Sequence, residues 1–271
     1  GGLVVGALGW RSVFFGTMVL ASAALAVAIL VLDGRRPVQR GGQRPEFDWP
    51  GAAFSTGAMV AFLLGLTAGP RVGWVSPLVV ASMLIFVGLL GAFIRWELRV
   101  STPMMDLKLF KGKLFALGVS ASFISFLGNS SVRFLMPFYL QAVLGYTPGQ
   151  IGLIIVPSAL AMVVIGPLSG RLSDRFGWRI FNVGGLLLSV TGLFLLSILR
   201  EDSSLVLVMA GMILQTSGTG AFNPPNNSSI LSAVEPSKYG VVSGFLNLVR
   251  NSANVTSTAL ATAIVTATMA S

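Results

Sequence analysis

The segment GPLSGRLSDRFGWR, residues Gly166–Arg179, stands between two long apolar runs and combines glycines, arginines and one aspartate. Its glycines permit a tight reversal and a close approach of two helices. Asp174 can stand near the N-terminus of the next helix, where a carboxylate is favoured, and the arginines can pair with it. The segment therefore predicts a short cytoplasmic loop that latches two helices in one conformation and releases them in another. A plain turn with positive charge is an equally good interpretation.

The composition around this segment is that of an integral membrane protein. Hydrophobic residues make up 54% of the chain and charged residues only 10%, whereas a soluble domain has roughly 25% charged residues. The absence of cysteine and histidine excludes disulfides, thiolate nucleophiles, the usual zinc sites and imidazole catalysis. We expect no cofactor and no metal. The net charge of +9 resides in short clusters between apolar runs, so it indicates a lipid bilayer as partner and not nucleic acid.

Apolar runs of the length that crosses a membrane, roughly 20 residues, recur along the whole chain. The predicted spans are Val13–Leu32, Gly51–Ala68, Val75–Trp96, Leu114–Val143, Gly149–Gly170, Ile180–Leu199 and Ser204–Leu231. An eighth span begins near Pro236, and Gly1–Leu8 is expected to be the tail of a further helix. The chain starts without Met and ends in an apolar stretch, so we expect a fragment of a longer polypeptide.

The lysines and arginines alternate between the two ends of these spans. Of the 18 basic residues, thirteen lie on the side of the loop Asp33–Asp48, three lie on the opposite side, and Arg133 and Arg250 fall inside spans. The positive-inside rule makes the richer side cytoplasmic. The regular alternation also supports the number of spans.

The loop motif carries a family resemblance. Its key residues are Gly170, Asp174, Arg175, Gly177 and Arg179. The motif resembles the loop signature of the major facilitator superfamily, with Trp178 as a departure. Further pieces in the right order resemble the fourteen-helix drug–proton antiporter branch of that family. These pieces are Gly1–Phe14, Pro103–Phe110, Tyr139–Gly145 and Gly240–Arg250.

The resemblance implies an all-α membrane protein, a major facilitator bundle with about eight of fourteen transmembrane helices. Residues 1–48 would be the end of the N-terminal bundle and a cytoplasmic loop. Residues 49–100 would be an inserted helix pair, and residues 101–271 would be a C-terminal bundle without its last helix. Such a protein would be a multi-pass protein of the bacterial inner membrane.

Polar residues at helical spacing inside the spans predict the wall of a substrate cavity. Ser122, Ser125, Asn129 and Arg133 share one helical face. A second such face holds Ser243, Asn247, Arg250, Asn254 and Ser257. A charged residue in mid-membrane normally faces a cavity or a partner; the alternative is a structural arginine that binds backbone carbonyls. We assign the cavity to Asn129, Arg133, Tyr139, Gln141, Asn247, Arg250 and Asn254.

A gate is predicted in the span Ser204–Leu231. Gly218, Gly220 and Pro224 are its candidate residues. The pair Pro224-Pro225 should break or kink the helix near its cytoplasmic end. The alternative is an ordinary helix terminus.

The function predicted from these features is export of small amphipathic molecules or drugs by proton antiport, with alternating access and no enzymatic activity. The nine acidic residues lie in loops or at helix ends, so a proton carrier would have to lie outside this chain. A specific exporter of a metabolite, such as a siderophore, lipid or amino acid, is the main alternative. A membrane enzyme or scaffold is a remote one, because no acidic metal-binding cluster is present.

Overall fold

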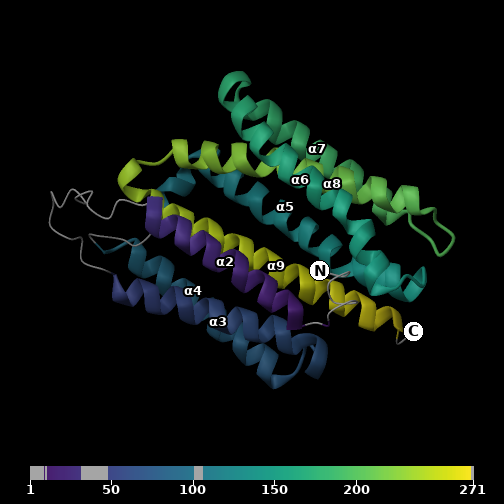
Figure 1. Cartoon of the computed structure of the whole chain (residues 1–271). Helices are drawn as coiled ribbons and strands as arrows, with labels where there is room; N and C mark the ends of the chain where they lie inside the picture. Colours follow the sequence, from purple (N-terminus) through teal and green to yellow (C-terminus); the bar gives the residue numbers. More distant parts are fainter. Residues whose placement is uncertain (1–8, 10, 32–47, 101–105, 270–271) are drawn as a thin grey trace.

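The computed structural model describes residues 9, 11–31, 48–100 and 106–269. The described residues form long helices joined by short turns (Figure 1). The elements are α2 (Arg11–Val31), α3 (Trp49–Val72), α4 (Pro77–Glu97), η1 (Leu107–Lys111), α5 (Lys113–Phe138), η2 (Tyr139–Val143), α6 (Pro148–Phe176), α7 (Trp178–Ser197), α8 (Leu205–Ser232), η3 (Pro236–Lys238) and α9 (Tyr239–Met269). The predicted helix at Gly1–Leu8 and the loop at 33–47 lie outside the described residues.

Helices α2 to α8 are long and apolar enough to cross a membrane, α5 together with η2. Helix α9, the eighth predicted span, has the length but is more polar. Large apolar side chains cover the outward faces of the helices, as expected where lipid replaces water. The chain is therefore a multi-pass membrane protein, and its all-helical fold confirms the predicted fold class.

Local chemistry explains where the helices begin and end. Proline stands in the first turn of α3, α4 and α6, where a missing N–H costs no helical hydrogen bond. The side chains of Ser76 and Ser204 accept hydrogen bonds from backbone N–H groups three residues on, as N-caps do. Pro137 near the end of α5 is followed by the π-helical turn η2, because proline cannot donate the usual backbone bond.

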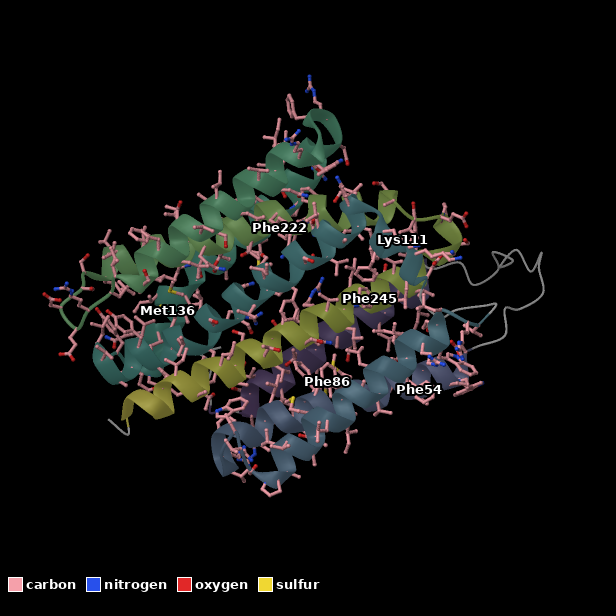
Figure 2. All side chains as sticks on the ribbon, turned by 180° about the vertical axis from the view of Figure 1, so that it is seen from behind. Phe54, Phe86, Lys111, Met136, Phe222 and Phe245 are labelled. Atoms are coloured by element: carbon pink, nitrogen blue, oxygen red, sulfur yellow. The ribbon has the colours of Figure 1, made fainter. Side chains whose placement is uncertain are left out.

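Helices α3 and α4 form a hairpin that packs mainly on itself. Asp48 joins the two ends of the hairpin that the positive-inside rule predicts to be cytoplasmic, and the ends of the bundle are named below by the same rule. One Asp48 carboxylate oxygen accepts hydrogen bonds from Gly51 N and from Trp96 Nε1, each at 2.9 Å. Phe62 and Phe86 stack with ring centroids 4.9 Å apart. Figure 2 shows Phe54 and Phe86 on this hairpin, away from Phe222 in the bundle above.

Helices α5 to α9 form a bundle with α9 between α5 and the hairpin (Figure 1). Two apolar clusters hold this bundle at its two ends. The cytoplasmic cluster consists of Phe115, Val119, Ile230, Val234, Val242 and Leu246. The outer cluster consists of Val132, Met136, Leu140, Ile151, Ile154, Val208 and Met212. Along α5 and α8, several buried polar side chains lie between these two clusters.

Candidate functional site

A layer of polar side chains lies between the two apolar clusters. We call it the polar layer and define it as Ser122, Ser125, Gln215, Thr219, Asn226 and Arg250. Five of these residues are buried and Arg250 is half-buried. They come from α5, α8 and α9, each near the middle of its helix or within two turns of it. Buried polar groups in a membrane bundle need partners, so the partners of each one indicate what it does.

Arg250 is the only member of the layer with a full charge. Its guanidinium carbon lies 4.7 Å from the ring centroid of Phe126 on α5, within the range of a cation–π contact. Its Nε is buried and has no hydrogen-bond partner. No carboxylate among the described residues pairs with it. The positive charge of Arg250 is therefore stabilised by the face of the Phe126 ring, and its buried Nε–H has no hydrogen-bond acceptor.

Two contacts lie on either side of Arg250: one joins α5 to α9, and the other joins η3, which precedes α9, to Asp106, the N-cap of η1, which precedes α5. The hydroxyl groups of Ser131 and Ser257 lie 2.7 Å apart in a hydrogen bond towards the outer end. At the cytoplasmic end the Lys238 ammonium donates a hydrogen bond to Asp106 at 3.1 Å. This hydrogen bond is the main reason that the pKa of the Asp106 carboxyl is lowered. The seam between α5 and α9 is thus made of polar and ionic contacts around a central arginine.

Asn226 joins three helices within the polar layer. Its Nδ2 donates hydrogen bonds to Ser122 Oγ at 2.8 Å and to the Gly118 carbonyl at 3.1 Å, both on α5. Its Oδ1 accepts a longer hydrogen bond of 3.4 Å from Asn182 Nδ2 on α7. The side chain is only 2% exposed. Sequence reasoning placed no function on Asn226, although its position in a run of asparagines and prolines was noticeable.

The predicted cavity residues do not all gather in the polar layer. On α5, Ser122 is buried against Asn226, Asn129 is half-buried and Arg133 is exposed. Tyr139 lies in the π-helical turn, where its hydroxyl donates to the Arg200 carbonyl at 2.6 Å, and Gln141 is exposed.

On α9, the predicted cavity residues also differ in their surroundings. Asn247 is exposed, Arg250 reaches Phe126, and Asn254 lines a groove that faces α3. The structure therefore brings α5 and α9 together through Arg250 and places Tyr139 and Gln141 near the outer turn.

The predicted gate residues pack against neighbouring helices. A Cβ on Gly218 would stand 2.7 Å from the Ser189 Cα of α7, and Gly220 accepts a hydrogen bond from Ser169 of α6 at 3.1 Å. A Cβ built on Gly170 of α6 would lie 3.6 Å from the Cβ of Pro224. A break at Pro224-Pro225 is wrong, because α8 runs unbroken from Leu205 to Ser232; a kink there, the other expected outcome, stays a prediction. Helices in membranes tolerate proline when neighbours satisfy the freed carbonyls.

The loop predicted at Gly170–Arg179 is also wrong in its extent. Residues up to Phe176 belong to the last turns of α6, and Gly177 alone separates α6 from α7. Gly177 has φ 87°, a conformation that glycine adopts without strain. Asp174 is exposed in the last turn of α6, four residues before the start of α7, with Arg175 beside it and Arg179 in the first turn of α7.

Metal ligands do not gather in this bundle. Within the described residues, no group of three or more histidine, cysteine, aspartate or glutamate side chains is close enough to hold an ion. The chemistry available at the polar layer is therefore binding through hydrogen bonds, charge and an aromatic ring.

Comparisons with known proteins identify the fold. A family model described as Major Facilitator Superfamily matches residues 1–258. The chain is 31% identical over 253 residues to the multidrug resistance protein Stp of Mycobacterium tuberculosis, covering 92% of this chain and 46% of Stp. It is 30% identical over 251 residues to the riboflavin transporter RibZ of Clostridioides difficile, covering 93% and 53%. It is 26% identical over 266 residues to the lincomycin resistance protein LmrB of Listeria monocytogenes, covering 98% and 56%.

The chain thus spans about half the length of the curated relatives that it matches. The family match covers the polar layer, the α6 motif and the helices that carry them, α9 as far as Thr258. The resemblance inferred from the loop motif is confirmed by this match, and the chain belongs to the Major Facilitator Superfamily.

Proposed function

We propose that the full-length protein that contains this chain is a secondary active transporter. It exports small amphipathic molecules or drugs by alternating access, in exchange for protons. Residues 101–271 form one of the two bundles that rock around a central site. Residues 49–100 form an inserted helix pair, and residues 1–48 end the other bundle and link it to this pair.

The observation that carries this proposal is the contact of Arg250 with Phe126 in mid-bundle. A cation in the membrane interior costs several kcal/mol unless it has a partner or reaches water. The ring of Phe126 compensates part of that cost, and the buried Nε stays without an acceptor. An arginine whose buried Nε–H has no acceptor is suited to bind one that is present during only part of the transport cycle. Such an acceptor could be a substrate oxygen or a carboxylate of the opposite bundle.

The proposed cavity extends from Arg250 along α5 and α9. Asn129 and Arg133 on α5 and Asn247 and Asn254 on α9 are half-buried or exposed in this chain, so they are available to face the opposite bundle. Tyr139 and Gln141 stand at the outer end of the same helix, beside the loop after α7. Polar groups of this kind, placed among apolar walls, are typical of sites that orient small molecules.

The cytoplasmic motif is the proposed latch. Gly170 and Pro224 bring α6 and α8 close together, and the exposed charges of Asp174, Arg175 and Arg179 surround the turn at Gly177. In the proposed cycle these charges pair with the opposite bundle in one state and separate in the other. Gly218 and Gly220 keep α8 close to its neighbours during that movement.

Protons are proposed to be carried outside this chain. The acidic residues that the structure describes lie at helix ends or in turns; Asp48, for example, caps α3 and Asp106 caps η1. Proton coupling usually requires a carboxylate or histidine within the membrane. We therefore expect the coupling carboxylate in the part of the full-length protein that precedes this chain.

The test uses the full-length gene expressed in an efflux-deficient bacterium. Ethidium efflux is followed with and without a protonophore, and an empty vector and an immunoblot of the membrane fraction serve as controls. Efflux that stops with the protonophore is the expected result. Efflux that continues unchanged would contradict proton coupling.

A specific exporter of one metabolite is the second candidate. It is favoured by the similarity to a protein named as a riboflavin transporter, and by an arginine suited to one defined acceptor. Siderophores, lipids and amino acids are other substrates to include. A panel of radiolabelled metabolites and dyes separates the two candidates, because export of one compound alone excludes the multidrug function.

A further inference from the structure

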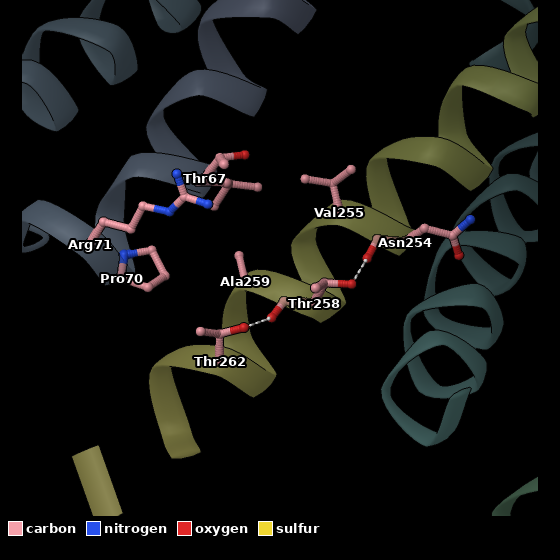
Figure 3. Close-up of a pocket in the computed structure, with 9 residues that line it drawn as sticks. Thr67, Pro70, Arg71, Asn254, Val255, Thr258, Ala259 and Thr262 are labelled. Carbon is pink, nitrogen blue, oxygen red and sulfur yellow. Dashed lines mark hydrogen bonds between the residues drawn. The ribbon is translucent and has the colours of Figure 1, made fainter. Parts of the chain in front are cut away.

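A groove of about 440 Å³ lies between the α3–α4 hairpin and the bundle (Figure 3). Its walls come from the last turns of α3 and from the outer half of α9. The residues that matter here are Thr67, Pro70 and Arg71 on α3, and Val255, Thr258 and Ala259 on α9. The groove belongs neither to the polar layer nor to the cytoplasmic motif.

Among the described residues that line this groove, Arg71 alone is charged. Figure 3 shows its side chain extending from α3 toward the space that faces α9. The side chain is exposed, and the guanidinium has no hydrogen bond or ion pair with any residue that the structure describes. The charge is therefore free to bind an anion from outside the chain.

The position of Arg71 along α3 places it at the outer surface of the membrane. Helix α3 has 24 residues and is about 36 Å long at 1.5 Å per residue, longer than the hydrocarbon core of roughly 30 Å. Arg71 stands in its last turn, at the end opposite the cytoplasmic cap Asp48. Its guanidinium thus lies at the level of lipid headgroups, and the rest of the groove faces the acyl chains below.

The other walls of the groove contribute few donors. Thr258 Oγ1 donates to the Asn254 carbonyl at 2.9 Å and Thr262 Oγ1 donates to the Thr258 carbonyl at 2.8 Å, both within α9. The side chain of Asn254 points away from Arg71 (Figure 3). Pro70, Val255 and Ala259 line the groove with apolar side chains. A ligand that fits must be mostly apolar and carry one anionic group at its outer end.

We propose that this groove binds an anionic phospholipid of the outer leaflet, with the phosphate on Arg71 and an acyl chain between Val255 and Ala259. Arginine offers phosphate a planar fork of donors, and the hydrophobic groove offers the chain a dry surface. The lipid fills the seam between the hairpin and α9, which is the helix of the bundle that packs on α3. This inference does not depend on the transported substrate or on proton coupling.

The test is native mass spectrometry of the intact, delipidated transporter, titrated with phosphatidylglycerol or with phosphatidylcholine. Arg71→Gln is compared with Arg200→Gln, which removes another exposed arginine from the outer side and does not line the groove. We expect Arg71→Gln to weaken phosphatidylglycerol binding about fivefold, as for one cation at an anionic membrane surface, and Arg200→Gln to leave it unchanged. Val255→Trp, which narrows the groove without removing charge, should lower binding of phosphatidylglycerol as well.

Several results would overturn the proposal. Equal phosphatidylglycerol binding in wild type and Arg71→Gln would mean that Arg71 does not hold the lipid phosphate. An equal loss in Arg71→Gln and Arg200→Gln would mean general attraction to surface charge. Displacement of the lipid by glycerol 3-phosphate at similar concentration, with no effect of Val255→Trp, would identify an anion site without an acyl-chain groove. A melting temperature of each variant within experimental error of wild type confirms that folding is not the cause.

Discussion

The α7–α8 interface and the α5–α9 seam differ in how two neighbouring helices are held. Between α7 and α8 the backbones almost touch, because Gly185, Gly192 and Gly218 have no Cβ to separate them. Between α5 and α9 the contacts are side-chain contacts, Arg250 on Phe126 and Ser131 with Ser257, and at the end of this seam Lys238 of η3 pairs with Asp106, the N-cap of η1. Small residues at a membrane interface give close van der Waals packing. We therefore expect the first interface to stay fixed, and the second to have groups that another partner can bind.

The largest expected effect is on the fixed interface. In Gly192→Ala the new Cβ would stand 2.7 Å from the Gln215 Cα of α8, so the two helices must move apart. We expect the free energy of unfolding to fall by about 3 kcal/mol, the upper range for overpacking. Thermal unfolding in detergent measures this, with Gly184→Ala as the matched control, because a Cβ on Gly184 meets nothing within 4 Å. Equal stability of the two variants would contradict backbone contact.

The sequence predicts the helices well because hydropathy, proline positions and arginine alternation all act locally. It also predicts the depth of Arg250, which follows from counting residues along one helix. The partner Phe126 was not predicted, since it depends on how α5 and α9 meet. The seven-residue steps Gly185–Gly192 and Gly211–Gly218 were a usable signal for the α7–α8 interface. The sequence alone does not show that these glycines face each other, because that depends on α7 pairing with α8.

The two wrong expectations have a common cause. At Gly170–Phe176 and at Pro224-Pro225, residues that favour loops in water lie inside helices. A buried backbone group without a partner costs several kcal/mol, so α8 continues through Pro224-Pro225, and α6 continues until Gly177 takes a positive φ. Hydroxyls then bind the helix carbonyls, as Ser173 does to Gly170 at 2.7 Å.

An intermediate effect is expected at Asn226, which connects the two regions through α8. Asn226→Ala removes its hydrogen bonds to Ser122 Oγ and to the Gly118 carbonyl. We expect a loss of about 1–2 kcal/mol in the free energy of unfolding, the size of interhelical hydrogen bonds in model peptides. Asn227→Ala is the neighbouring control, because Asn227 is less buried and makes no such bonds. Thermal unfolding in detergent measures this loss, and equal stability of the two variants would refute this role.

The smallest expected effect concerns the ionic end of the α5–α9 seam. Asp106→Asn keeps an acceptor for the Lys108 N–H but loses the charge that faces Lys238. The two side chains are 26% and 44% exposed, so solvent screening limits the loss to about 0.5 kcal/mol. High salt should reduce it further.

The pH dependence of that effect follows from the lowered pKa of Asp106. A carboxyl with a depressed pKa in the folded state contributes stability above its unfolded pKa, near the ordinary value of 3.8, and loses it as the pH falls through the folded pKa. Melting temperatures of wild type and Asp106→Asn should thus differ at pH 7 and converge in acid. A difference that persists in acid would assign the effect to packing.

The central claim is that the α5–α9 seam carries function and that α7–α8 carries structure. The most direct measurement is transport by the full-length protein with Arg250→Gln, in cells with equal amounts of protein in the membrane, beside Arg200→Gln as the control. The account predicts that Arg250→Gln abolishes export while its melting temperature stays near that of wild type, and that Arg200→Gln exports normally. Normal export by Arg250→Gln would contradict the account and leave Arg250 a structural residue that binds Phe126.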